Sequence, residues 1–211
     1  MFPFKKLPAY GWSAAFLMLG TNCLVYYGSR LLNTSWRHYD FSCGLDHRIP
    51  FIGGFVIVYM LLAYFQWICG FYFAVNEERH ICRRICISEV TAKLLCLVCF
   101  LVIPTTMTRE TITGTDLFSR SLLLVYDIDP ADNLLPSVHC LESYLLARVL
   151  PWMKDVPGWY KKFTVPATVL VMLSTLFVKQ HVIADVIAAV LVVEVGIAVS
   201  RIITSRLEEL Q

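Results

Sequence analysis

The chain has 211 residues, of which 57% are hydrophobic and 16% charged, and its mean hydropathy is +0.63. This balance is typical of a polytopic membrane protein and argues against a soluble globular domain. The formal net charge of +2, with no basic residues clustered on a soluble face, argues against a nucleic-acid partner. The eight cysteines follow no zinc-binding spacing, so we expect small buried hydrophobic side chains and neither a metal nor a cofactor.

Six apolar stretches are predicted to cross the membrane as helices, because a helix needs about 20 mostly apolar residues to span a bilayer. They predict an all-α fold, a six-transmembrane-helix bundle in which residues 1–211 form one integral membrane domain. The connection from about Thr108 to Leu135 is long enough to cover a site as a lid. The predicted spans are Tyr10–Leu32, Pro50–Val75, Ser88–Met107, Ser137–Trp152, Lys162–Val178 and His181–Ile203.

Basic residues orient this predicted bundle. With the N-terminus inside, the pairs Lys5–Lys6, Arg83–Arg84 and Lys161–Lys162 fall on the cytoplasmic side, as the positive-inside rule requires. The sequence therefore predicts a multi-pass protein of the cell membrane with both termini in the cytoplasm. In this topology the end of the third span, the start of the fourth and the turn before the sixth share the extracytoplasmic face.

A histidine and an aspartate begin the sixth predicted span. His181 and Asp185 are four residues apart, so they share one face of a helix. A carboxylate in this position can accept the Nδ1 proton of the imidazole and leave Nε2 free as a nucleophile. The same spacing also fits a polar pair that faces water at a helix start.

A second polar cluster, Pro136-Ser137-Val138-His139, begins the fourth predicted span. Proline and serine are typical of a helix start, where backbone amides and the helix dipole form an anion site. Ser137 could donate to a phosphate oxygen, and His139 could protonate a leaving alkoxide. The same four residues would also fit a capped helix start whose histidine has no role in function.

Taken together and in this order, the two clusters resemble two signature motifs of the type 2 phosphatidic acid phosphatase superfamily. The second motif of that superfamily is Pro-Ser-Gly-His, and its third is Ser-Arg, five residues, His, three residues, Asp. Here they appear as residues 136–139 and as Ser174-Thr175, five residues, His181, three residues, Asp185. The resemblance covers about residues 50–200 and implies the six-helix bundle.

The resemblance implies a role for each matching residue. His181 is then the nucleophile that forms a phosphohistidine, Asp185 orients it, and His139 is the general acid and later the base. Ser137 and the Val138 amide would bind phosphate oxygens. The family requires no metal, because positive charge and positioning from the protein stabilise the phosphoryl group.

Several family residues are replaced in this chain. Arg109 matches the arginine of the first motif, Lys, six residues, Arg-Pro, but Val102 and Glu110 occupy its lysine and proline positions. Thr175 replaces the arginine of the third motif, and a valine replaces the glycine of the second. Lys179 could supply one missing cation, so Arg109 and Lys179 are expected to bind phosphate. These departures from the motifs are similar to those in the branch that includes inositol phosphotransferases and sphingomyelin synthases.

Two further residues are expected behind the site. Glu142 lies one helical turn after His139 and could tune it, bind a polar headgroup or be a buried structural acid. Ser174 begins the third motif and is expected to support it.

Three functions follow from these residues. The leading one is a membrane enzyme that hydrolyses a lipid phosphomonoester or pyrophosphate on the extracytoplasmic face. The second is a phosphotransferase that passes a phosphate-bearing headgroup to a lipid alcohol. The third is a non-catalytic lipid-phosphate binder or transporter, although binding alone would need cations rather than a nucleophile and an acid. A lipid phosphate and membrane lipids are the expected partners, and the oligomeric state stays open.

Overall fold

The computed structural model describes residues 6–209. The two ends of the predicted domain 1–211, which include Lys5, lie outside these described residues. The structure is 73% helical, with two strands of two residues each among the described residues, and it confirms the all-α prediction.

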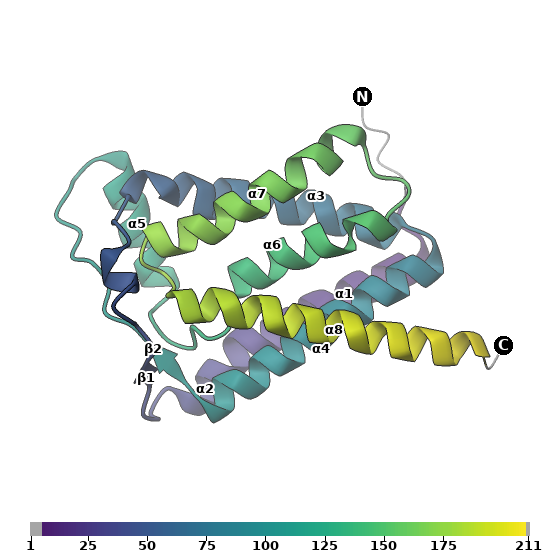
Figure 1. Cartoon of the computed structure of the whole chain (residues 1–211), viewed down its shortest axis with the longest axis horizontal. Helices are drawn as coiled ribbons and strands as arrows, with labels where there is room; N and C mark the ends of the chain where they lie inside the picture. The colour runs from purple at the N-terminus through teal and green to yellow at the C-terminus, as the bar shows by residue number, and fades with distance from the viewer. Residues whose placement is uncertain (1–5, 210–211) are drawn as a thin grey trace.

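The helices lie roughly along one long axis and form an elongated bundle (Figure 1). The π-helical segment Leu24–Gly28 joins α1 to α2, and a second one, Val58–Leu62, leads into α3. Short 3-10 helices occupy Asp46–Arg48, Gly53–Phe55 and Leu150–Trp152. The α-helices are α1 (Ala9–Cys23), α2 (Ser29–Asn33), α3 (Ala63–Asn76), α4 (Arg79–Val102), α5 (Leu117–Ile128), α6 (Val138–Val149), α7 (Gly158–Phe177) and α8 (Ile183–Glu209).

Three helices of the described chain are long and apolar enough to cross a membrane: Gly53–Asn76, Arg79–Val102 and Ile183–Leu207. They correspond to the second, third and sixth predicted spans. The other three predicted spans also lie on helices of the bundle, and their crossing of a membrane stays a prediction.

The third predicted span, Ser88–Met107, has both ends misplaced. Helix α4 begins nine residues earlier, at Arg79, because the basic turn of residues 79–84 continues the helix without a breaker. It ends at Val102, since Ile103 precedes Pro104 and leaves the helical region with φ −136° and ψ 72°.

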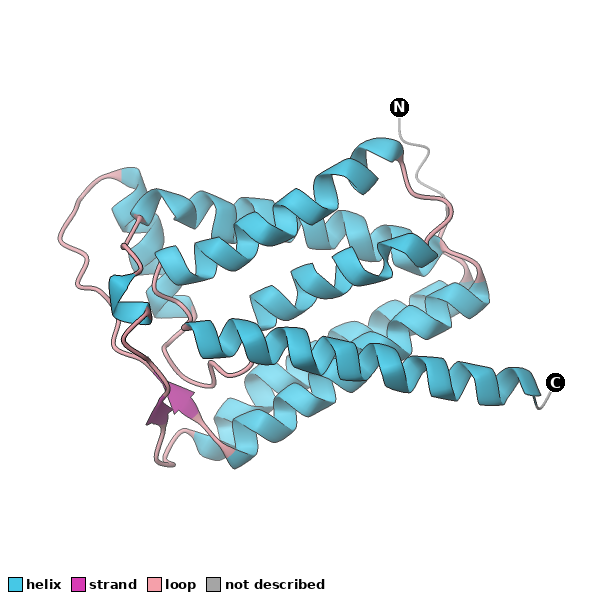
Figure 2. Cartoon of the chain, viewed as in Figure 1, coloured by secondary structure: helices cyan, strands magenta, loops and turns pink. Residues whose placement is uncertain are grey.

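Beyond Pro104 the chain forms a small parallel strand pair, which Figure 2 shows at one end of the bundle. Strand β2 (Thr105–Thr106) pairs with β1 (Tyr39–Asp40), with Tyr39 opposite Thr105 and Asp40 opposite Thr106. The pair joins the segment after α2 to the segment after α4.

The long connection predicted as a lid contains helix α5. The Asp116 carboxylate caps this helix by accepting the N–H groups of Phe118 and Ser119. Two buried residues of α5, Leu122 and Val125, belong to a hydrophobic cluster with Tyr59 and Val178. The connection is therefore folded against the start of the α3 region and the end of α7.

Helix α6 lies inside the main core. Its buried face carries Cys140, Leu141, Leu145, Leu146 and Val149, which pack in one cluster with residues of α3, α4, α7 and α8. Helices α4 and α8 approach each other closely at Gly196, where a Cβ atom would collide with the Ser88 carbonyl oxygen.

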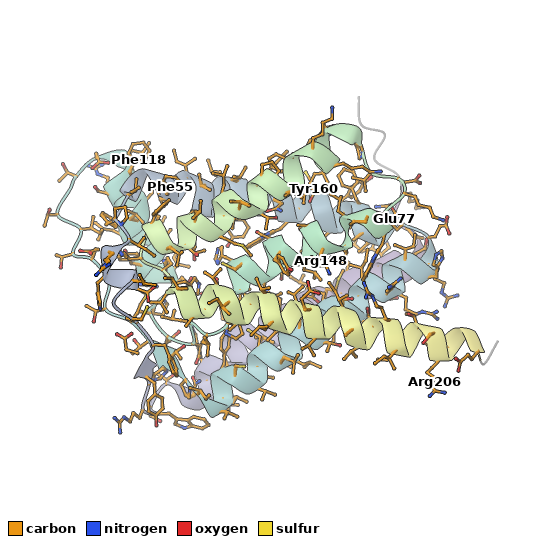
Figure 3. The ribbon with its side chains drawn as sticks, viewed as in Figure 1. Phe55, Glu77, Phe118, Arg148, Tyr160 and Arg206 are labelled. Carbon is orange, nitrogen blue, oxygen red and sulfur yellow. The ribbon has the colours of Figure 1, made fainter. Side chains whose placement is uncertain are left out.

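The outer faces of the helices are apolar. Large exposed hydrophobic side chains include Phe16, Leu61, Ile68, Val102 and Ile202. A soluble monomer rarely exposes so many large apolar side chains, whereas lipid tails would cover them. Figure 3 shows Phe55 and Phe118 at the end that carries α5, and Arg206 toward the opposite end.

Candidate functional site

The two motif segments meet where helices α6 and α8 begin. The backbone N–H of Ser137 donates to the Asp185 carbonyl oxygen at 3.2 Å. The Ser137 hydroxyl accepts the N–H of Cys140 at 3.3 Å, so it caps α6 as the sequence predicts. The helix start that carries His139 is therefore joined directly to the helix start that follows His181.

Asp185 holds the ring of His181. Its Oδ2 lies 3.1 Å from Nδ1 of His181 and also accepts the N–H of Val182 at 3.0 Å. Both side chains are buried, with 7% and 1% exposed. An ionised carboxylate only accepts hydrogen bonds, so Nδ1 carries the proton and Nε2 keeps its lone pair.

A tyrosine and a second aspartate hold His139. The Tyr59 hydroxyl lies 3.2 Å from Nδ1 of His139 and donates to Oδ2 of Asp129 at 3.2 Å. The Tyr59 ring stacks on the imidazole with centroids 4.1 Å apart. Because the single hydroxyl proton goes to Asp129, Nδ1 of His139 is the donor to Tyr59. Nε2 of His139 is buried and has no hydrogen-bond partner among the described residues.

Both histidines line one cavity of about 290 Å³, called here the histidine cavity. Val138 and Glu142 line it as well, together with residues that the sequence did not single out as site residues, above all Arg30 and Asp129. The cavity therefore brings the predicted nucleophile and the predicted general acid together.

Among the described residues, Arg30 is the arginine or lysine that lines the histidine cavity. Two carboxylates bind it. Its guanidinium lies 3.0 Å from Asp129 and 2.6 Å from Asp132, and stacks over the Tyr26 ring at 4.2 Å. Burial alone would raise the pKa of Asp129, but the Tyr26 hydrogen bond, the nearby histidines and Arg30 hold that pKa below its ordinary value. Asp129 is thus a carboxylate at neutral pH.

A second ion cluster lies beneath the cavity and is called here the buried triad: Glu89, Lys93 and Glu142. The Lys93 ammonium is fully buried between the two carboxylates, 3.8 Å from Glu89 and in direct contact with Glu142. It also donates to the Asn22 side chain. One oxygen of each carboxylate, Oε2, is buried without a partner among the described residues. The pair of Lys93 with Glu89, four residues apart on α4, is therefore part of a larger cluster.

Arg109 lies behind His181 and does not line the cavity. Its guanidinium donates to the Tyr126 carbonyl at 3.2 Å and to the side-chain oxygen of Gln180, and it stacks over the Tyr126 ring. Arg109 thus binds the residue immediately before His181, and its predicted contact with phosphate stays a prediction.

Lys179 and Ser174 also lie outside the cavity lining. The Lys179 ammonium donates to the carbonyls of Asp46 at 3.0 Å and Ile49 at 2.7 Å. The Ser174 hydroxyl donates to the Val171 carbonyl at 2.7 Å within α7. Lys179 therefore holds the loop before α3 against the α7–α8 turn, which supports the backbone around His181.

Sequence reasoning missed three residues of the cavity: Arg30, Tyr59 and Asp129. A charged residue at the end of an apolar span is a signal for function, and Arg30 near the end of the first predicted span carries it. Asp129 lies in the long connection before α6, where an aspartate is common, so it gives no signal. Tyr59 gave no signal, because a tyrosine in an apolar helix is common.

Within residues 6–209 no group of three or more His, Cys, Asp or Glu side chains is placed to hold a metal ion. The cavity contains two imidazoles, one held by a carboxylate and one by a tyrosine–carboxylate pair. No family model, curated protein or solved structure matches this chain.

Proposed function

We propose that the protein is an integral membrane enzyme that hydrolyses a lipid phosphate ester through a phosphohistidine on His181. One observation carries this proposal. A single cavity contains His181, oriented by Asp185, and His139, oriented by Tyr59. A nucleophile and a separate acid in one cavity are what covalent phosphoryl transfer needs.

In the first step, Nε2 of His181 attacks the phosphorus and the bond from phosphorus to the lipid oxygen breaks. His139, protonated at both nitrogens, gives its Nε2 proton to the leaving oxygen. The Asp129 charge, relayed through Tyr59, stabilises this imidazolium. The lipid alcohol leaves, and the phosphoryl group stays on His181.

In the second step, Nε2 of His139 removes a proton from water, and the water oxygen attacks the phosphorus. The P–N bond breaks, inorganic phosphate is released, and His139 again carries both protons. Asp185 accepts a hydrogen bond from the Nδ1–H of His181 in both steps and so stabilises the positive charge that develops on that ring.

We propose the cell membrane as the location, with six crossings, both termini in the cytoplasm and the histidine cavity on the extracytoplasmic side. The three long apolar helices and the apolar outer faces support insertion in a bilayer. The start of α1 and the end of α8 lie at one end of the bundle, away from the start of α6 (Figure 1). This arrangement supports a site and chain ends on opposite sides.

A second candidate is a phosphotransferase, in which a lipid alcohol replaces water in the second step. A groove of about 450 Å³ between α1 and α3 adjoins the histidine cavity, and four residues line both: Asn22, Tyr64, Trp67 and Glu142. Such a groove offers room for a second lipid chain. A non-catalytic carrier is less well supported, because Arg30 in the cavity lining and Lys93 in the buried triad are already paired with carboxylates.

The test is turnover by the purified protein in detergent, with a panel of lipid phosphates offered with and without lipid alcohols. Free phosphate and lipid products are measured together. We expect phosphate release that is abolished in His181→Ala and His139→Ala and severely lowered in Asp185→Asn. His80→Ala is the matched control, because His80 is exposed and pairs with Glu78 outside the cavity.

The outcomes separate the candidates. A new lipid product that appears only with an alcohol would move the assignment to the phosphotransferase. Undiminished phosphate release by the His181 variant would refute the phosphohistidine mechanism. Binding of lipid phosphates without turnover by any acceptor would favour the carrier.

A further inference from the structure

The groove between α1 and α3 has apolar walls and a polar end. Its walls include Met18 and Leu19 from α1 and Ile68 and Phe71 from α3. Glu142 stands where the groove meets the histidine cavity, since it lines both. A lipid whose chain occupied this groove would therefore place its polar part against Glu142 and the histidines.

Fixed charges around this junction are unfavourable for a purely anionic ligand. Three cations, Arg30, Lys93 and Arg109, stand against five carboxylates, which are those of Asp129, Asp132, Glu89, Glu142 and Asp185. With neutral histidines the balance is two negative charges. The second proton that His139 carries in the first step lowers this balance to one negative charge. A phosphate that enters alone would meet net repulsion.

Glu142 also has an unused hydrogen-bond acceptor. One carboxylate oxygen contacts Lys93, while Oε2 is buried and has no partner among the described residues. The side chain is only 8% exposed, so this oxygen has lost its hydration without a protein donor in return. A buried carboxylate oxygen of this kind is costly unless a ligand donates to it.

We propose that Glu142 binds an ammonium group of the substrate, which makes the substrate a zwitterionic lipid phosphate with its ammonium a few bonds from the phosphate. The inference rests on the proposed function, because it takes His181 as the place of the phosphate. An ammonium offsets the negative balance of the cavity and donates to the free oxygen of Glu142.

The spacing of the residues fits such a ligand. Glu142 follows His139 by three residues on α6, which is roughly 4.5 Å along the helix axis. Because His139 faces the leaving oxygen in the proposed mechanism, two to four bonds between that oxygen and the ammonium would cover this distance. Aromatic rings complete the wall, because Tyr64 and Trp67 line both spaces, and aromatic faces attract cations.

The experiment measures binding to the intact protein in detergent, by native mass spectrometry, with two matched pairs of lipids. The first pair is phosphatidylethanolamine and phosphatidylglycerol, which differ by an ammonium or hydroxyls in the headgroup. The second pair is a long-chain-base 1-phosphate and its N-acetyl form, in which a neutral amide replaces the ammonium of the backbone. Turnover is measured in parallel, so that binding preference and catalysis are separate readouts.

We expect the ammonium member of at least one pair to bind about tenfold tighter, as one charge-assisted hydrogen bond implies. The pair that shows the preference identifies headgroup or backbone as the source of the ammonium. Glu142→Gln should remove the preference. Glu110→Gln, which removes the same charge from an exposed loop, should keep it.

Equal affinities within both pairs for the wild-type protein would overturn the inference without any variant. A preference that survives in a folded Glu142→Gln protein would overturn the role of Glu142. Tighter binding of phosphatidylglycerol would show a hydroxyl site instead of an ammonium site. An ammonium preference without turnover would uphold the binding site and reject the proposed enzyme.

Discussion

Replacing Tyr59 by phenylalanine removes one hydroxyl and keeps the ring that stacks on His139. The hydroxyl makes two hydrogen bonds of 3.2 Å, one with Nδ1 of His139 and one to Asp129. In the variant Nδ1 of His139 keeps its proton but loses its acceptor, while Asp129 keeps its bonds from Tyr26 and Arg30. The change thus acts on the proposed general acid and leaves the nucleophile, His181, with its partner.

The size of the effect follows from those two bonds. A buried donor left without an acceptor costs about 1–3 kcal/mol, so we expect that loss in the free energy of unfolding. General acid catalysis contributes about 10²–10⁴-fold, and stacking still places the His139 ring. We therefore expect Tyr59→Phe to lower kcat by roughly 10- to 100-fold, which is less than the loss in His139→Ala.

The assay compares the natural lipid ester with an activated ester such as a nitrophenyl phosphate. A nitrophenolate leaves without a proton, so the defects of Tyr59→Phe and His139→Ala should shrink on this substrate. Tyr160→Phe is the control, because its hydroxyl donates to the Gln66 carbonyl at 2.7 Å inside the bundle and outside the histidine cavity. A Tyr59→Phe defect of equal size on both esters, or wild-type kcat on the lipid, would refute the relay.

Two further changes test the packing and the ions of the bundle by thermal unfolding in detergent. Gly196→Ala should lower the free energy of unfolding by about 1–3 kcal/mol, because its Cβ meets the backbone of Ser88 and α4 must move away from α8. Gly20→Ala, with nothing within 4 Å of its Cβ, should be neutral or stabilising, and equal effects at both positions would contradict the close approach. Lys93→Met should cost about 3–5 kcal/mol, because it leaves two buried carboxylates without their cation, and an unchanged midpoint would show that they are protonated.

The sequence predicted helix caps and side-chain pairs well where a single residue type determines the local structure. Ser137 caps α6 as expected, since its hydroxyl replaces a missing backbone acceptor there. The pairing of His181 with Asp185 also follows from local geometry, because residues four apart share a helix face. Helix ends were less predictable: α4 starts at Arg79 because a basic turn can extend a helix as readily as end it.

Contacts between distant segments could not be read from the sequence. Asp129 is some 100 residues from Arg30 and 70 from Tyr59, and nothing in its local sequence marks it as their partner. Lys179 is a second example, and its contact with phosphate stays a prediction. Its closeness to His181 suggested a phosphate ligand, but a positive φ of 52° turns the backbone there and its ammonium binds two loop carbonyls.

The two segments that resemble family motifs contain the residues of the proposed chemistry, whereas neighbouring helices determine the charge around them. The cations that these helices bring are bound by carboxylates: Arg30 on α2 lies beside two aspartates, and Lys93 on α4 lies between two glutamates. Both proposed catalytic imidazoles are kept and held by partners. A site with the proposed nucleophile and acid, surrounded by carboxylates, is suited to phosphoryl transfer from a ligand that is not purely anionic. The ligand that fits such a site carries its own positive charge beside the phosphate.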